Sequence, residues 1–201
     1  AISALSMEER MTICNMSIEG GARCGYINPD EKTYSYMKDK LCVPKNENWE
    51  KAVNWWKSLE SSDNCIYDDV FKLDASKVEP TITWGITPGQ SIGVNQKIPS
   101  LNEIDPNDQF IAGEAYEYMG FKPGQSIKNT PIDVCFIGSC TNGRISDLRV
   151  AAQVLEHQKV AKNIKAFVVP GSEKVAKEAK EEGLDKIFIK AGFQWREPGC
   201  S

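Results

Sequence analysis

Residues 132–144 read IDVCFIGSCTNGR, and this stretch decides how the second half of the chain folds. Its first six residues, 132–137, form a short apolar run that is typical of parallel strands buried on both faces. The glycines and small polar residues of 138–144 then indicate a tight turn. Apolar residues at helical spacing follow the turn, namely Leu148, Ala151, Ala152 and Leu155. The stretch therefore predicts a strand, a turn and a helix.

The same order of elements is expected again over the rest of the chain. Residues 164–169 form a second apolar run, and Pro-Gly-Ser at 170–172 supplies the next turn. A helix is expected over 173–182, closed by Gly183, and residues 187–190 are the predicted third strand. Strands that alternate with helices in this way form a parallel sheet with right-handed crossovers. The predicted fold class is therefore α/β, with the order β-α-β-α-β.

The chain as a whole is predicted to hold three parts. Residues 1–79 form part of one α/β domain, and a change in composition near Glu79-Pro80 marks its end. Residues 80–131 are rich in Pro, Gly and Asn, and they are predicted to be a linker that leads into the next domain. Residues 132–201 form part of that second domain. Helices are expected in the first two parts at 6–18, 31–38, 47–60 and 108–119, with a strand at 66–73.

Composition narrows the classes of function. The chain has 201 residues and a formal net charge of −4. Because it is acidic and has no cluster of Lys and Arg, nucleic acid is not the expected ligand. Its apolar runs are far too short to cross a bilayer, and no charged-then-apolar leader opens the sequence, so no membrane partner is expected. Seven widely spaced cysteines without a CxxC indicate reduced thiols. We expect a cytoplasmic protein, with a mitochondrial one as the alternative.

Side chains that can bind a metal or an anion are predicted to lie together at one edge of the sheet. Ligands of open parallel sheets bind beyond the carboxyl ends of the strands. Two of the three turns there bring a cysteine, Cys140 and Cys200, and the turn between them brings Ser172 at a helix start. Two thiolates could bind a soft metal centre or a cluster. The amides of the helix N-termini, together with Arg144, could hold carboxylate groups.

The residues alone leave other interpretations of Cys140 open. It could be a small residue that fills a tight turn, or a thiol of a zinc site. It could also be a nucleophile exposed by strand–turn–helix geometry. That chemistry needs a base, and the only histidine, His157, is expected to face solvent at the far end of the following helix. A complete Cys–His nucleophile is therefore not expected within this chain.

Several motifs, in order along nearly the whole chain, resemble the aconitase superfamily. Two of them are similar to that family's iron–sulfur signatures: IGSCTNGR at 137–144 matches the first, and PGCS at 198–201 matches the start of the second. The remaining segments lie upstream or between these two. They are NMSIEGGAR at 15–23, NPDEKT at 28–33, VPGS at 169–172 and AGFQWR at 191–196.

The resemblance implies a fold, a cofactor and a set of site residues. The fold is aconitase-like, three-layer αβα with a parallel sheet, and the chain would hold two partial domains of it. The cofactor is a 4Fe–4S cluster held by three cysteines, of which Cys140 and Cys200 match two and the third lies beyond the chain end. Asn15 and Glu19 match the family's active-site Asn and Glu. The positions of Arg144 and Ser172 beside the signature and at the next turn suggest that both bind substrate.

The resemblance also implies an activity. The Gly-Arg after Cys-Thr-Asn, and the final GFQWREPGC, are most similar to the large subunits or regions that isomerise 2-isopropylmalate to 3-isopropylmalate in leucine biosynthesis. The reaction is a dehydration followed by a rehydration. The implied partners are the small-molecule substrate and a small subunit, or further domains, that carry a swivelling domain.

Alternatives of two classes remain to this activity. Homoaconitase and aconitase are the alternatives within the superfamily, and a cluster-free RNA-binding regulator is the alternative from another class. The chain starts without Met and ends one residue after a cysteine, so we expect a piece of a longer protein that is inactive alone.

Overall fold

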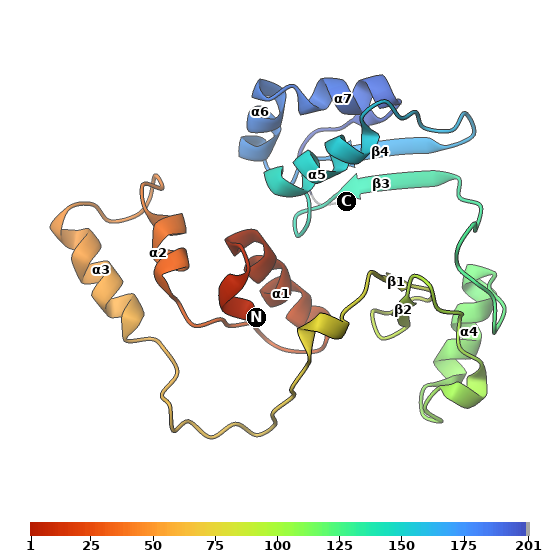
Figure 1. The fold of residues 1–201 in the computed structure, drawn as a ribbon, viewed down its shortest axis with the longest axis horizontal. Coiled ribbons are helices and arrows are strands. Elements are labelled where there is room, and N and C mark those ends of the chain that lie inside the picture. The colour runs from red at the N-terminus through yellow and green to blue at the C-terminus, as the bar shows by residue number, and fades with distance from the viewer. Residues whose placement is uncertain (200–201) are drawn as a thin grey trace. The chain divides into compact units, whose positions relative to one another are not determined.

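A computed structural model describes residues 1–199 of the chain. The described chain divides into two compact units, and Figure 1 labels the helices and strands along it. The first holds residues 1–18, residues 23–65 and the segment from residue 132 onward, and the second holds residues 19–22 and 66–131. No helix of the described chain has the length and apolar character needed to cross a membrane.

A parallel three-stranded sheet organises the C-terminal part of the first unit. Its strands β3 (Val134–Gly138), β4 (Lys165–Val169) and β5 (Gln194–Trp195) lie side by side in chain order. Val134 pairs with Lys165 and Gly138 with Val169, so the first two strands match along their full length. Helix α5 (Ile145–Leu155) connects the first two strands. The predicted α/β class with a parallel sheet is confirmed.

The third strand was predicted in the wrong place. Residues 187–190 belong to helix α7 (Leu184–Ala191), which follows α6 (Glu173–Glu181), and the third strand is Gln194–Trp195. The physical reason is the spacing of buried side chains. Leu184, Ile187, Phe188 and Ala191 stand at i, i+3, i+4 and i+7, which is the period of a helix. Left-handed glycines at 183 and 192 (φ of 75° and 106°) flank this helix.

The helices of this unit cover one face of the sheet. Helices α5, α6 and α7 contact one another, and their apolar side chains pack with Ala166 and Val168 of β4 and with Cys135 and Ile137 of β3. Alternate side chains of a strand point to opposite faces. The other face is open at β3, where Val134 and Phe136 are 52% and 44% exposed. The described residues thus supply two layers of the expected αβα fold, and the third layer stays a prediction.

The helices expected in the N-terminal part are present. They are α1 (Met7–Glu19), α2 (Glu31–Met37) and α3 (Glu47–Lys57), with short 3₁₀ turns at Ile2–Ala4 and Ala75–Lys77. The ring of Trp56 on α3 stacks on Tyr34 of α2 at a centroid distance of 6.3 Å. Aromatic stacking therefore joins these two short helices.

The segment predicted as a strand at 66–73 forms none. Residues 66–73 pair with no other strand of the described chain, and Ile66 and Phe71 are 97% and 85% exposed. The alternation of apolar and polar residues favours an extended chain, but a strand also needs a partner for its backbone groups. No described segment supplies that partner.

The second unit has a small core of its own. Strands β1 (Thr81–Thr83) and β2 (Ser91–Gly93) pair antiparallel, and a 3₁₀ turn at Leu101–Glu103 precedes helix α4 (Gln109–Met119). The helix ends at Gly120 as predicted. The core residues are Trp84, Ile98, Ala112, Ala115, Tyr116 and Ile127. Residues 80–131, which we expected to be a linker, therefore include a packed cluster, and the boundaries of the domains at 79 and 131 stay predictions.

Candidate functional site

The loop that carries Cys140 leaves β3 through a sharp turn. Gly138 and Ser139 both have positive φ angles, 138° and 96°, and this region of backbone conformation favours glycine. A Cβ atom on Gly138 would lie 2.2 Å from the carbonyl oxygen of Val169 on the neighbouring strand. The turn leaves Cys140 exposed, and the Ser139 hydroxyl donates to its sulfur at 3.9 Å. The thiol therefore stands at the carboxyl end of β3.

Hydrogen bonds join the three loops at this edge of the sheet. The amide of Gly171, after β4, donates to the carbonyl oxygen of Gly143 at 2.8 Å. The amide of Gly199 donates to the carbonyl oxygen of Pro170 at 3.3 Å. The Cys140 loop and Gly199 thus each form one hydrogen bond with the turn at residues 170–171. Cys200 itself lies outside the described residues.

The close packing of these loops requires glycine at position 143. A Cβ atom there would lie 2.4 Å from the carbonyl oxygen of Ser139 and 2.9 Å from the amide nitrogen of Gly171. Both of these are backbone atoms, so the loop would have to move.

Gly143→Ala is expected to lower the free energy of unfolding by about 1–3 kcal/mol, the usual cost of overpacking. Urea titration of the variant measures this change. The matched control is Gly199→Ala, because an added methyl at Gly199 meets no atom of residues 1–198 within 4 Å. Equal stability of the two variants would contradict the packing argument.

Arg144 and Ser172 both lie at this edge, each at the start of a helix. Arg144 precedes α5, and its Nε donates to the carbonyl oxygen of Thr141 at 3.1 Å. The guanidinium is half-buried, and its terminal Nη groups carry the remaining donors. Ser172 caps α6 by accepting a hydrogen bond from the amide of Val175 at 3.2 Å. The hydroxyl and the guanidinium supply two kinds of donor for an anionic ligand.

Asn15 and Glu19 lie on α1, one turn apart, and both are exposed. Residues spaced by four share a face of a helix. Thr12 of the same helix meets the cysteine loop, because the Asn142 side-chain amide donates to the Thr12 hydroxyl at 3.4 Å. Asn15 itself forms no hydrogen bond to this loop within residues 1–199. Thr12 belongs to none of the motifs that resemble the family, although its spacing of three from Asn15 places it near the same face of the helix.

His157 cannot be the base that the nucleophile interpretation of Cys140 needs. His157 follows α5 at the end away from the cysteine loop, and its side chain is 86% exposed. An eleven-residue helix is roughly 16 Å long, far beyond hydrogen-bond reach. This confirms the expected solvent-facing position of the histidine.

The metal-ligand set is not complete within the described chain. Among residues 1–199, no three His, Cys, Asp or Glu side chains are grouped so that they could hold a metal ion. The donor that is present has the chemistry of a cluster ligand, since iron–sulfur clusters are held by cysteine thiolates. An exposed thiol and a close-packed glycine turn at one sheet edge fit a cluster whose other ligands come from position 200 and beyond.

The fold and this edge together define a class of protein. It is an α/β protein with a cysteine loop at the carboxyl end of the first strand of a parallel sheet, and this is the edge at which open parallel sheets bind their ligands. A family model described as "Aconitase family (aconitate hydratase)" matches residues 1–201, and the chain belongs to the aconitase family.

Similar proteins carry the name 3-isopropylmalate dehydratase large subunit. That of Prochlorococcus marinus subsp. pastoris is 94% identical over 201 residues, which is 100% of this chain and 43% of the relative. That of Prochlorococcus marinus strain MIT 9515 is 85% identical over the same shares. That of Nostoc punctiforme is 64% identical over 197 residues, 98% of this chain and 42% of the relative. The chain therefore spans less than half the length of the relatives it matches.

Proposed function

We propose that this chain is the part of an iron–sulfur hydro-lyase that presents the cluster to 2-isopropylmalate, which the whole enzyme converts to 3-isopropylmalate in leucine biosynthesis. One observation carries the proposal. In a chain of the aconitase family, the hydrogen bonds of Gly171 and Gly199 gather the Cys140 loop and the segment before position 200 at one sheet edge. The proposed partner is a small subunit, and the proposed compartment is the cytoplasm.

Cysteines would hold the cluster in the whole protein. Cys140 and Cys200 would be two ligands of a 4Fe–4S cluster, and a cysteine beyond residue 201 would be the third. When bound, such a cluster supplies an iron without a protein ligand, which acts as a Lewis acid toward a hydroxyl and a carboxylate. The exposure of Cys140 supports this role, because a thiol closed off by side chains could not reach a cluster.

The other residues of the site would bind the substrate and move a proton. The Arg144 guanidinium suits a carboxylate, since its planar donors match the two carboxylate oxygens. The Ser172 hydroxyl would donate to a second carboxylate oxygen. Glu19 would give a proton to the departing hydroxyl oxygen, while a base from the rest of the protein takes the proton of the neighbouring carbon, and both transfers would run in reverse when water returns. Asn15, one turn earlier on the same face of α1, would hold that oxygen by a hydrogen bond from its side-chain amide.

Glu19→Gln tests the proton-transfer role. The amide keeps the shape of the side chain but cannot exchange the proton, so kcat is expected to fall about 10²–10⁴-fold. Iron content should stay unchanged, because Glu19 is not a cluster ligand in this proposal. Glu8→Gln on the same helix is the control and should keep wild-type kcat. A kcat of the Glu19 variant equal to that of the Glu8 control would contradict the proton-transfer role of Glu19.

The proposed function as a whole is tested on the full-length subunit, reconstituted anaerobically with iron and sulfide and combined with its small subunit. We expect interconversion of the two isopropylmalates through an unsaturated intermediate that absorbs in the ultraviolet. Homocitrate and citrate are the comparison substrates, and faster turnover of either would select the homoaconitase or aconitase alternative. Salt-dependent binding of RNA by the cluster-free protein, without turnover of any of the three acids, would select the regulator instead.

A further inference from the structure

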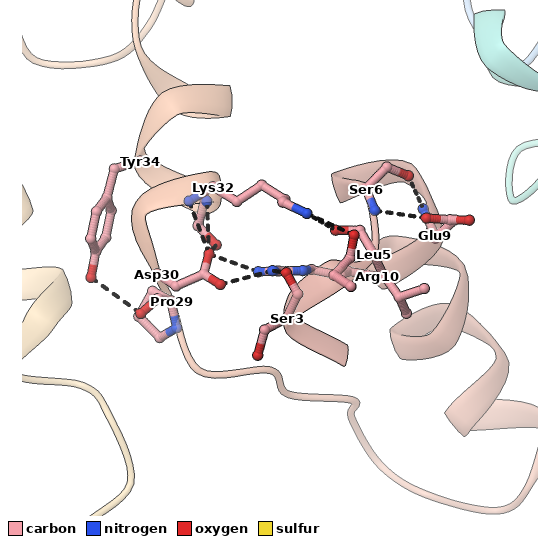
Figure 2. A network of polar contacts seen from close by, with 11 residues as sticks. Ser3, Leu5, Ser6, Glu9, Arg10, Pro29, Asp30, Lys32 and Tyr34 are labelled. Atoms are coloured by element: carbon pink, nitrogen blue, oxygen red, sulfur yellow. Dashed lines mark hydrogen bonds and ion pairs between the residues drawn. The ribbon is translucent and has the colours of Figure 1, made fainter. Parts of the chain in front are cut away.

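An ion pair between the buried Arg10 and Asp30, whose side chain is 40% exposed, fixes the start of helix α1. Arg10 is 2% exposed, and its guanidinium donates two hydrogen bonds of 2.8 Å to the two carboxylate oxygens of Asp30 (Figure 2). A third bond, of 3.0 Å, runs to the carbonyl oxygen of Ser3. The Nε of Arg10 is buried and has no hydrogen-bond partner within the described chain. Within residues 1–199, Asp30 is the one carboxylate that forms an ion pair with this guanidinium.

Asp30 belongs to a second helix at the same time. Its carboxylate caps α2 by accepting from the amides of Lys32 and Thr33, both at 3.1 Å. The bonds from Arg10 hold the pKa of Asp30 well below its usual range, so the pair is charged at neutral pH. Lys32 completes the connection, because its Nζ donates to the carbonyl oxygens of Ala4 and Leu5 at 2.8 and 2.7 Å (Figure 2). The N-terminus of α2 is thus bound to the segment that starts α1.

Two further contacts fix α1 beyond its first turn. The chain returning toward Asp30 passes so close that a Cβ atom on Gly25 would lie 2.5 Å from the Cα atom of Cys14. On the same helix, Thr12 accepts the hydrogen bond from Asn142 in the cysteine loop. Helix α1 is therefore held by the return segment on one side and meets the Cys140 loop on another. Asn15 stands three residues beyond Thr12.

We propose that the Arg10–Asp30 pair is a positioning device that holds α1 so that Asn15 is presented to the cysteine loop. The inference rests on the proposed function for its catalytic consequence. Arg10 and Asp30 would touch neither substrate nor cluster. Loss of the Asp30 charge would leave a buried cation unpaired, which strongly favours movement of the side chain and its helix. A shift of about 1 Å in a positioned group can cost about 100-fold in rate.

The test uses the assembled, reconstituted enzyme with Asp30→Asn. We expect kcat to fall about 10–100-fold, while KM and the iron content stay within about twofold of wild type, because the substrate and cluster ligands are untouched. Asp30→Glu, which restores the charge, should recover most of kcat. Lys57→Gln is the matched control, because it removes the exposed 3.7 Å ion pair with Glu31, which is also on α2 but forms no hydrogen bond or ion pair with α1 within residues 1–199. The control should keep wild-type kcat.

A second readout does not depend on the reaction. Cys14 is half-buried on α1 against Gly25, whereas Cys42 is exposed and serves as an internal reference. Alkylation measured by mass spectrometry should become at least about tenfold faster at Cys14 in Asp30→Asn, through local opening of the helix, and unchanged in Lys57→Gln. If Asp30→Asn does not fold, kcat and the rate of Cys14 alkylation are compared between Arg10→Lys and Asp30→Glu.

The outcomes separate the two proposals. A wild-type enzyme that does not turn over isopropylmalate contradicts the proposed function. In that case the rate of Cys14 alkylation still tests whether the Arg10–Asp30 pair holds α1. An active wild type with unchanged kcat in Asp30→Asn overturns the inference alone. Faster alkylation of Cys14 with unchanged kcat overturns it as well, because the helix would then move without affecting the site.

Discussion

Cys140→Ser in the reconstituted full-length subunit is expected to abolish the broad visible absorbance of the cluster and to lower kcat by at least about 10³-fold. Iron–sulfur clusters are held by thiolates, and a serine hydroxyl at neutral pH is a far weaker ligand for iron. The substitution exchanges one atom on an exposed residue, so the sheet edge should keep its structure. Absorbance and the iron-to-sulfide ratio after anaerobic reconstitution measure the loss.

Two comparisons make this result specific. Cys42→Ser replaces another exposed thiol in the first unit and should leave the cluster intact. A chain extended past Ser201 should take up iron and sulfide better than residues 1–201, because it adds the expected third ligand. Full cluster content in Cys140→Ser would show that the loop after β3 does not ligate iron, and the cluster assignment would then fall.

Phe188→Ala is expected to lower the free energy of unfolding by about 3–5 kcal/mol. Phe188 on α7 is fully buried, and its ring packs edge-on against Phe193 and tilted against Trp195 at centroid distances of 5.6 and 6.0 Å. Truncation removes this apolar surface and leaves a cavity between the helix and β5. Because Trp195 lies on β5, this strand, which precedes Cys200 in the chain, should lose packing too.

The neighbouring residue provides the control for this truncation. Ile189 is 56% exposed on the same helix, so Ile189→Ala should cost less than about 1 kcal/mol. Urea titration followed by near-ultraviolet circular dichroism compares the two midpoints. A Phe188→Ala midpoint as high as that of Ile189→Ala would mean that the described core does not stabilise this part of the chain.

Local patterns predicted most of the elements, because their causes are local. The helical spacing of Leu148, Ala152 and Leu155 predicted α5, and Gly183 closed α6 where expected. The two errors concern segments whose state depends on neighbours. Residues 187–190 were assigned from a short apolar run, which cannot distinguish a strand from one side of a buried helix. Residues 66–73 have the pattern of a strand but no partner within the described chain.

The positions of three site residues could also be predicted from the local order of elements. Strand–turn–helix order was enough to place Cys140, Arg144 and Ser172 at one edge, and the hydrogen bond between Gly171 and Gly143 shows that their loops meet. Contacts between distant segments were not predictable. The Asn142–Thr12 bond joins residues 130 positions apart, and no local pattern encodes it. The catalytic roles of Asn15 and Glu19 still rest on the resemblance.

The order of the strands has a consequence for how the site is made during protein synthesis. Strands β3, β4 and β5 are neighbours in the sheet in the order in which the ribosome produces them. Domains generally fold as units from the N-terminus during synthesis. The bond that joins Gly171 to Gly143 needs only residues made before β5. The two loops that this bond joins are therefore complete in the nascent chain before position 200 is made, and in the proposed function the ligand at Cys140 would precede the one at Cys200.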